Sequence, residues 1–89
     1  MSDVRDAPSE SRFVLKEAGG TAFAAYQRRG ESIVFTHTEV PDALAGHGVG
    51  SRLVRGALDA ARAEGLTVVP ECSFVRDYID RHPEYRDLL

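Results

Sequence analysis

The chain has 89 residues, of which 43% are hydrophobic and 28% are charged, and its formal net charge is -3. This length fits one domain, the apolar fraction excludes an intrinsically disordered chain, and the absence of a basic face argues against a nucleic-acid partner. One cysteine and three scattered histidines exclude an internal disulfide and give no metal-binding spacing. Since no apolar run is long enough to span a membrane, we expect a cytoplasmic protein, as a monomer or weak dimer.

Alternation of apolar and polar residues predicts three antiparallel strands in the first half of the chain. Residues 1–11 carry almost nothing apolar, so we expect a flexible leader followed by one domain over 12–89. The three strands are predicted at residues 12–17, 21–28 and 32–40. Turns at 19–20 and 29–31 join them, and Pro41 ends the third strand because it has no N–H to donate. This third strand is rich in β-branched and aromatic residues, which predicts burial on both faces.

The apolar residues then change to a helical period. Two helices and the strand between them are predicted at residues 48–64, 73–81 and 66–69. Gly65 closes the first helix, Pro70 stops the strand, and Pro83 opens a last short turn. A strand–helix–strand unit of this length should form a right-handed parallel crossover. The expected fold is α+β, with helices packed on a mixed sheet.

A glycine-rich loop lies between the third predicted strand and the first predicted helix. It reads Ala45-Gly46-His47-Gly48-Val49-Gly50-Ser51. Glycines let the backbone approach a bulky anion, and the unpaired N–H groups of a first helical turn favour negative charge, so a pyrophosphate fits the loop. A tight turn with close helix-to-sheet packing explains the same glycines. The loop has no P-loop lysine and does not follow the first strand of a parallel sheet, which disfavours nucleotide hydrolysis and dinucleotide binding.

The element order and the loop together resemble the GNAT superfamily of N-acetyltransferases, whose acyl-CoA motif is Q/R-x-x-G-x-G/A. Gly48 and Gly50 supply the paired glycines of the motif. Ala45 stands where the motif has glutamine or arginine, so one polar contact to the cofactor is missing. The backbone N–H groups of the loop are unaffected by this change.

A closer resemblance, to minimal single-domain GNAT-like proteins, covers most of the expected domain. It is carried by the segments 37–41 (HTEVP), 46–51 (GHGVGS), 69–75 (VPECSFV) and 82–85 (HPEY). The resemblance implies acetyl-CoA as cofactor, with its pantetheine between strands that end near Val40 and Val69 and its thioester close to Cys72. The cofactor-binding residues that it implies are Val40, Gly46, His47, Gly48, Val49, Gly50 and Ser51.

Acetyl transfer to an amine needs a base, a donor to the thioester carbonyl and an acid for the departing thiolate. The candidates are Cys72, Tyr78, His37 and Glu39. Cys72 precedes a helix N-terminus, which favours a thiolate; it is either an acyl-accepting nucleophile or a buried lining thiol. Tyr78 resembles the tyrosine that protonates the CoA thiolate in many GNAT enzymes, or is a core aromatic. His37 and Glu39 share one strand face, as base and orienter or as ordinary strand-end residues.

The acceptor side is expected to be open and shallow. Larger GNAT enzymes have two helices that shape an acceptor pocket, whereas residues 15–23 leave room only for a turn. An open site suits a protein or peptide amine. The resemblance therefore implies an acetyl-CoA-dependent N-acetyltransferase with an unidentified amine acceptor. The alternative is a non-catalytic acyl-CoA-binding or protein-interaction module, which Ala45 and the missing helices favour.

Overall fold

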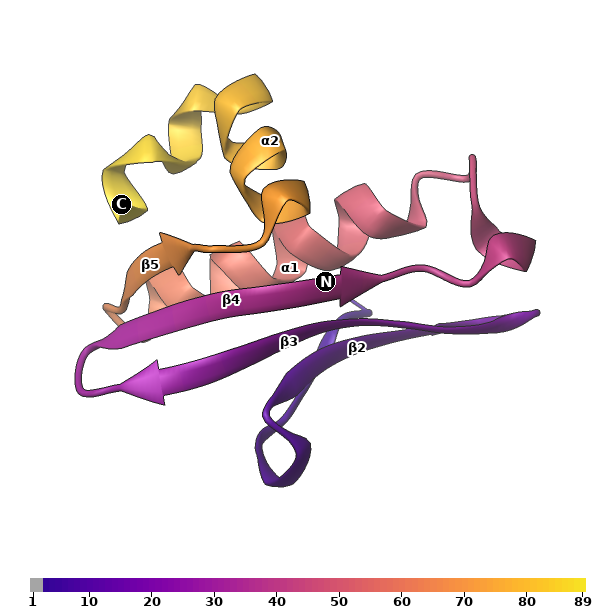
Figure 1. Cartoon of the computed structure of the whole chain (residues 1–89), viewed down its shortest axis with the longest axis horizontal. Coiled ribbons are helices and arrows are strands. Elements are labelled where there is room, and N and C mark those ends of the chain that lie inside the picture. The colour runs from indigo at the N-terminus through magenta and orange to yellow at the C-terminus, as the bar shows by residue number, and fades with distance from the viewer. Residues whose placement is uncertain (1–2) are drawn as a thin grey trace.

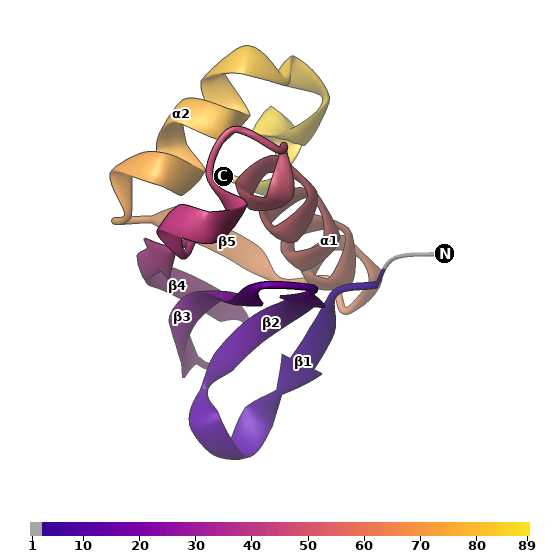
Figure 2. The ribbon, with the colours of Figure 1, turned by 90° about the vertical axis from the view of Figure 1, so that its right-hand side faces the viewer.

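The computed structural model describes residues 3–89, which form a five-stranded mixed sheet with both α-helices on one side (Figure 1 and Figure 2). The strands are β1 (Arg5–Ala7), β2 (Arg12–Glu17), β3 (Gly20–Arg29), β4 (Ser32–Glu39) and β5 (Thr67–Pro70). The helices are α1 (Val49–Ala63) and α2 (Ser73–Arg81), with 3-10 helices η1 (Pro8–Glu10), η2 (Asp42–Leu44) and η3 (Pro83–Leu88). The strands lie side by side in chain order, antiparallel from β1 to β4 and parallel between β4 and β5. The predicted α+β fold is confirmed.

The expected flexible leader is wrong for residues 5–10, which form β1 and η1. The backbone of Arg5–Ala7 pairs with Arg12–Val14 of β2. Asp6 Oδ1 also accepts a hydrogen bond from the Tyr26 hydroxyl at 2.6 Å. Burial and this bond raise the pKa of Tyr26 to about 12. Met1 and Ser2 belong to the same predicted leader but lie outside the described residues.

The predicted helices agree closely with the observed ones. Helix α1 lies within the predicted range 48–64, and Gly65 follows it with a φ of +70°, in the left-handed region that favours glycine. Helix α2 has the predicted bounds, and η3 begins at Pro83 as expected. Within residues 3–89, neither α-helix is long and apolar enough to cross a membrane.

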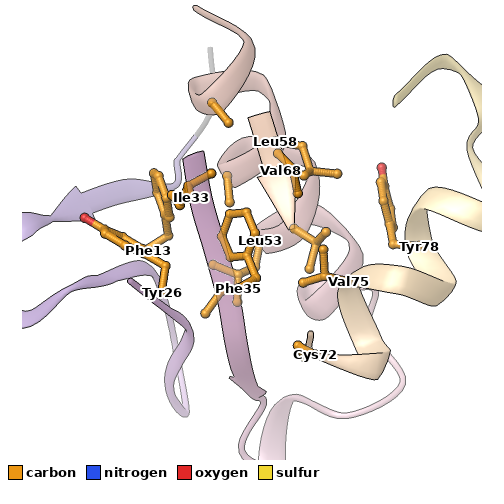
Figure 3. Close-up of a cluster of buried hydrophobic side chains, with 14 of the residues drawn as sticks. Phe13, Tyr26, Ile33, Phe35, Leu53, Leu58, Val68, Cys72, Val75 and Tyr78 are labelled. Carbon is orange, nitrogen blue, oxygen red and sulfur yellow. The ribbon is translucent and has the colours of Figure 1, made fainter. Parts of the chain in front are cut away.

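The hydrophobic core lies between the sheet and the two helices (Figure 3). Its largest fully buried side chains are Phe35, Leu15, Ile33, Leu53, Leu58, Ile79, Val54, Val68 and Val75. They come from β2, β4, β5, α1 and α2, so this one cluster fixes the helices on the sheet. Because the helices cover only one face, the other face of β2–β4 is free of helical packing.

Strand β4 is buried on both faces only over Ile33–Phe35, so the predicted burial of the whole strand is wrong. From Thr36 to Glu39 its side chains are exposed or half-buried. The pairing with β3 shifts here: Tyr26 lies opposite Phe35, whereas Ala25 lies opposite His37. Thr36 is therefore the extra residue of a β-bulge, which bends the end of β4.

Polar contacts attach the C-terminal segment to α1. The Arg62 guanidinium donates to both carboxylate oxygens of Asp87, at 2.6 and 3.0 Å. The Tyr85 hydroxyl donates to Asp59 Oδ1 at 2.7 Å, and burial together with this bond raises the pKa of Tyr85 to about 12. These contacts hold η3 against the helix.

Truncation of Leu53 tests the central position of α1 in the core. Leu53 is 0% exposed, so Leu53→Ala should lower the free energy of unfolding by about 2 to 5 kcal/mol. Leu89 is 57% exposed, and Leu89→Ala should change the free energy of unfolding by less than about 0.5 kcal/mol. Urea denaturation followed by circular dichroism measures both, and equal effects of the two substitutions would contradict the assigned core.

Candidate functional site

The parallel strands β4 and β5 separate after the pair Phe35–Pro70. Pro70 has no N–H to continue the ladder, and the chain turns away there. Two residues later the Cys72 N–H donates to the Phe35 carbonyl oxygen at 2.9 Å, and helix α2 then begins. Strand β4 continues to Glu39 without β5 beside it. A stretch of strand edge over residues 36–39 therefore lies next to the N-terminus of α2.

A cavity of about 260 Å³ lies just beyond this edge, between Val40, the glycine-rich loop and Phe74 at the start of α2. It is lined by Val40, Leu44, Ala45, Gly46, Gly48, Val49, Gly50, Ser51 and Phe74. Six of the seven predicted cofactor-binding residues are thus brought together. The seventh, His47, is exposed in the loop and does not line the cavity.

The N-terminus of α1 opens into this cavity with free backbone donors. Gly46 and Gly48 have φ values of +82° and +73°, a conformation that favours glycine. The Arg52 N–H makes the first helical bond, to the Gly48 carbonyl oxygen at 3.0 Å, and no side chain among the described residues caps the helix. The N–H groups of Val49, Gly50 and Ser51 precede that bond, so they are available to an anion.

Gly50 allows an aromatic ring to lie directly on the first turn of α1. A Cβ atom at Gly50 would lie 2.5 Å from Cζ of Phe74, which no side chain tolerates without a shift of the ring. Phe74 is 40% exposed although it is a large apolar residue. Its ring therefore forms one wall of the cavity.

Phe74, Leu44 and Thr38 are site residues that the sequence analysis missed. For Phe74 the sequence gives no separate signal, because its i, i+4 spacing from Tyr78 places it at the edge of the apolar stripe of the second helix. For Thr38 no signal exists, since its importance depends on the bulge in β4.

Cys72 lies at the junction of the strand edge and α2. It is buried, and its thiol donates to Thr38 Oγ1 at 3.4 Å; once the thiol has lost its proton, the Thr38 hydroxyl rotates and donates to the thiolate instead. Burial raises the pKa of the thiol, but hydrogen bonds from the Thr38 side chain and from the backbone N–H groups of Val75, Phe74 and Thr38 outweigh it. The net pKa of Cys72 lies below its ordinary value. These contacts favour a thiolate at this position.

His37 and Glu39 lie together, but on the opposite face of β4 from Thr38. Thr38 pairs with Ala24, which is buried under the helices, whereas His37 pairs with Ala25. His37 Nε2 lies 3.6 Å from Glu39 Oε2, and both side chains are exposed. The predicted sharing of one strand face is confirmed. The separated end of β4 thus carries a thiol on one side and a histidine–carboxylate pair on the other.

Tyr78 is not brought to this region. Its ring stacks on His82 with 4.1 Å between ring centroids, and burial raises the pKa of its hydroxyl. Figure 3 shows the hydroxyl directed away from Cys72. The placement fits a core aromatic rather than the expected acid. Within residues 3–89 no cluster of three potential metal ligands occurs.

Residues 12–88, from β2 to η3, match the model of the GCN5-related N-acetyltransferase family. The chain belongs to this family. Protein NATD1 from Gallus gallus and from Mus musculus are each 36% identical to this acetyltransferase-family chain over 63 residues, which cover 70% of the chain and 57% of the relative. The match thus spans little more than half the length of these curated relatives. The sequence resemblance to the GNAT superfamily is confirmed.

A solved structure supports the same family fold. The NMR solution structure of a GCN5-like protein from Staphylococcus aureus superposes with a TM-score of 0.73 and 28% sequence identity. The superposition covers 99% of this chain and 89% of the other. The GNAT-like fold predicted from the sequence is therefore confirmed.

Replacement of Thr38 by valine tests the contact that lowers the Cys72 pKa. Thr38→Val removes the side-chain hydrogen bond, so the pKa of the thiol should rise, and more alkali should be needed to form the thiolate. Ultraviolet absorbance of the thiolate measures this directly, because Cys72 is the one cysteine of the sequence. Thr36→Val is the matched control, since Thr36 bonds to the Ala25 carbonyl oxygen instead. An unchanged titration in Thr38→Val would contradict the assignment.

Proposed function

We propose that this protein binds acetyl-CoA and transfers the acetyl group to an amine. The observation that carries the proposal is the uncapped N-terminus of α1, whose free N–H groups face a cavity beside the separated end of β4. Backbone donors of this kind suit a pyrophosphate, and the helix dipole adds to the attraction. The family assignment supports the same cofactor.

The residues of the cavity fit the parts of the cofactor. Val49, Gly50 and Ser51 would hold the pyrophosphate through their N–H groups. The strand edge over residues 36–39 offers backbone groups to the amides of the pantetheine, and Val40 and Phe74 offer apolar contact. Ala45 adds no polar contact, so binding rests on the backbone. When bound, acetyl-CoA supplies an activated thioester.

The acceptor amine is proposed to react at the end of β4. Glu39, oriented by His37, takes a proton from the amine while its nitrogen forms a bond to the acetyl carbon. The thioester C–S bond would break, and the proton taken by Glu39 would pass through water to the departing sulfur to give the free thiol of coenzyme A. Cys72, on the other side of the strand, has the lowered pKa that an acyl-accepting thiolate needs. Tyr78 has no part in this scheme.

The second candidate function is an acyl-CoA-binding module without turnover. Ala45 supports it, because a polar side chain of the family motif is missing there. The two functions share the cofactor and differ in catalysis. The open acceptor side suits a protein or peptide amine in the first case and a protein partner in the second. The expected cytoplasmic location and the monomeric or weakly dimeric state stay predictions.

A charge placed at Ser51 tests the cofactor site without straining the backbone. Ser51 is exposed in the first turn of α1, where a glutamate is favourable for the helix itself. Ser51→Glu should weaken acetyl-CoA binding about tenfold or more, roughly 1.4 kcal/mol, through repulsion of the pyrophosphate. Ser51→Gln, of the same size without charge, should bind within a few-fold of the unmodified chain. Calorimetry measures both, and a folded unmodified chain that does not bind acetyl-CoA would overturn both candidate functions.

Substitution of Glu39 separates catalysis from binding. Glu39→Gln should lower kcat about 100-fold or more and leave acetyl-CoA affinity unchanged, because the carboxylate acts on the amine and not on the cofactor. Glu31→Gln, at an exposed turn, is the control. Acetyl transfer that persists in Cys72→Ala would indicate direct transfer to the amine. Full turnover in Glu39→Gln would show that another group is the base.

A further inference from the structure

The face of the sheet that the helices leave uncovered has an ordered arrangement of side chains. Directly paired residues on neighbouring strands point to the same face. The strand register gives two rows across this face, Arg5–Val14–Phe23–Glu39 and Ala7–Arg12–Ala25–His37. Lys16 and Thr21, a further pair, lie on it as well. The face thus ends, on β4, at the histidine–carboxylate pair of the proposed site.

Positive charge gathers on the β1–β2 side of this face. Within residues 3–89, Arg5, Arg12 and Lys16 make no ion pair and donate no side-chain hydrogen bond. The Arg12 guanidinium lies 4.0 Å from the centroid of the Phe23 ring, and its Nε is buried with no acceptor. Unpaired cations held over an apolar surface are favourable partners for a carboxylate.

A hollow of about 490 Å³ lies over these cations, with Val14 and Phe23 as apolar parts of its lining. Two carboxylates also line it. Asp6 already accepts the Tyr26 hydroxyl at 2.6 Å, and Glu10 lies in η1 at the β1–β2 connection. The remaining carboxylate of the face, Glu39, lies two strands from Arg12, next to His37. The β1–β2 side thus carries three cations against these two carboxylates, and one further carboxylate lies on β4.

The strand spacing sets the dimensions of a matching ligand. Neighbouring strands lie about 4.8 Å apart, so the cations of β2 and β1 are roughly 10 to 14 Å from the level of Glu39. An extended peptide rises about 3.3 Å per residue, which makes this distance roughly three to four residues. A ligand with an amine at one end, an apolar middle and a carboxylate at the other end follows the face from β4 to β1.

We propose that the helix-free face of β1–β4 docks the amine acceptor, and that the acceptor is an acidic peptide. Its reactive amine lies at His37 and Glu39, and its acidic side chains, roughly three to four residues away, meet Arg5, Arg12 and Lys16. The role of the amine rests on the proposed acetyl transfer. The docking of the acidic segment does not, and it can be measured without turnover.

The test is a titration of the unmodified 89-residue protein, without acetyl-CoA, with a capped peptide that holds one lysine and aspartates three and four residues from it. Nuclear magnetic resonance should show shifts at Thr21, Phe23 and His37, and binding should weaken with added salt. A peptide with serines in place of the aspartates should bind more weakly. Shifts confined to other residues, or equal binding of the two peptides, would overturn the proposal.

Substitutions on the face provide the matched comparison. The double variant Arg5→Gln/Lys16→Gln keeps the Arg12–Phe23 contact. It should lower the affinity for the acidic peptide roughly three- to tenfold, as the loss of two exposed ion pairs predicts. The double variant Arg81→Gln/Arg86→Gln also removes two exposed cations, from α2 and η3, and should leave binding unchanged. An equal loss in both variants would show a net-charge effect and overturn the proposed face.

The acceptor proposal and the proposed function fail separately. If the protein binds acetyl-CoA but the acidic peptide shifts no resonance, the docking face is wrong and the cofactor site stands. If the peptide binds at the face but acetyl-CoA does not bind, the docking face stands and the acetyl transfer is wrong. With both bound, kcat/KM for the aspartate peptide should exceed that for the serine peptide, and the double variant should remove most of the difference.

Discussion

The hydrogen bond from the Cys72 N–H to the Phe35 carbonyl oxygen is the contact on which the arrangement of the site depends. It lies just after Pro70, where the parallel ladder can go no further. The bond fixes the start of α2 against β4, which puts the thiol beside Thr38 and the Phe74 ring on Gly50. It also leaves the end of β4 without a neighbouring strand. The cavity and the strand edge are thus two results of one interrupted pairing.

The end of β4 divides the proposed chemistry between two faces of a single strand. Thr38 and Cys72 lie on the helix side with the cavity, and His37 and Glu39 lie on the open side with the uncovered rows of the sheet. A cofactor and an acceptor can therefore approach the same few residues from different directions. Because β4 is anchored by Ile33 and Phe35 in the core, both approaches meet a rigid element. Within residues 3–89, β2 and β3 are joined by a turn alone, so the open side of the sheet is not covered there by a helix.

Sequence periodicity predicted the helices and the crossover well, because α1 and α2 each bury a regular apolar stripe. It missed β1, because the exposed Arg5 and Asp6 carry no apolar signal. This strand is held by backbone pairing with β2 and by the hydrogen bond from Tyr26 to Asp6. The loop glycines were predicted because their conformation is local. The Cys72–Thr38 contact and the displacement of Tyr78 depend on the bulge and on where α2 begins, and such long-range geometry leaves no mark in local patterns. The position of Phe74 on Gly50 is of the same kind.

The order of the sheet has a consequence for how the chain folds. From β1 to β4 every strand pairs with its immediate neighbour along the chain, so these contacts close short loops and should form early. The pairing of β4 with β5 must instead wait for the crossover through α1, the longest closure in the sheet. Since the interrupted end of that pairing creates the cavity, we expect the binding region to assemble in the last step of folding. A chain released from the ribosome would then acquire its meander well before it could hold a ligand.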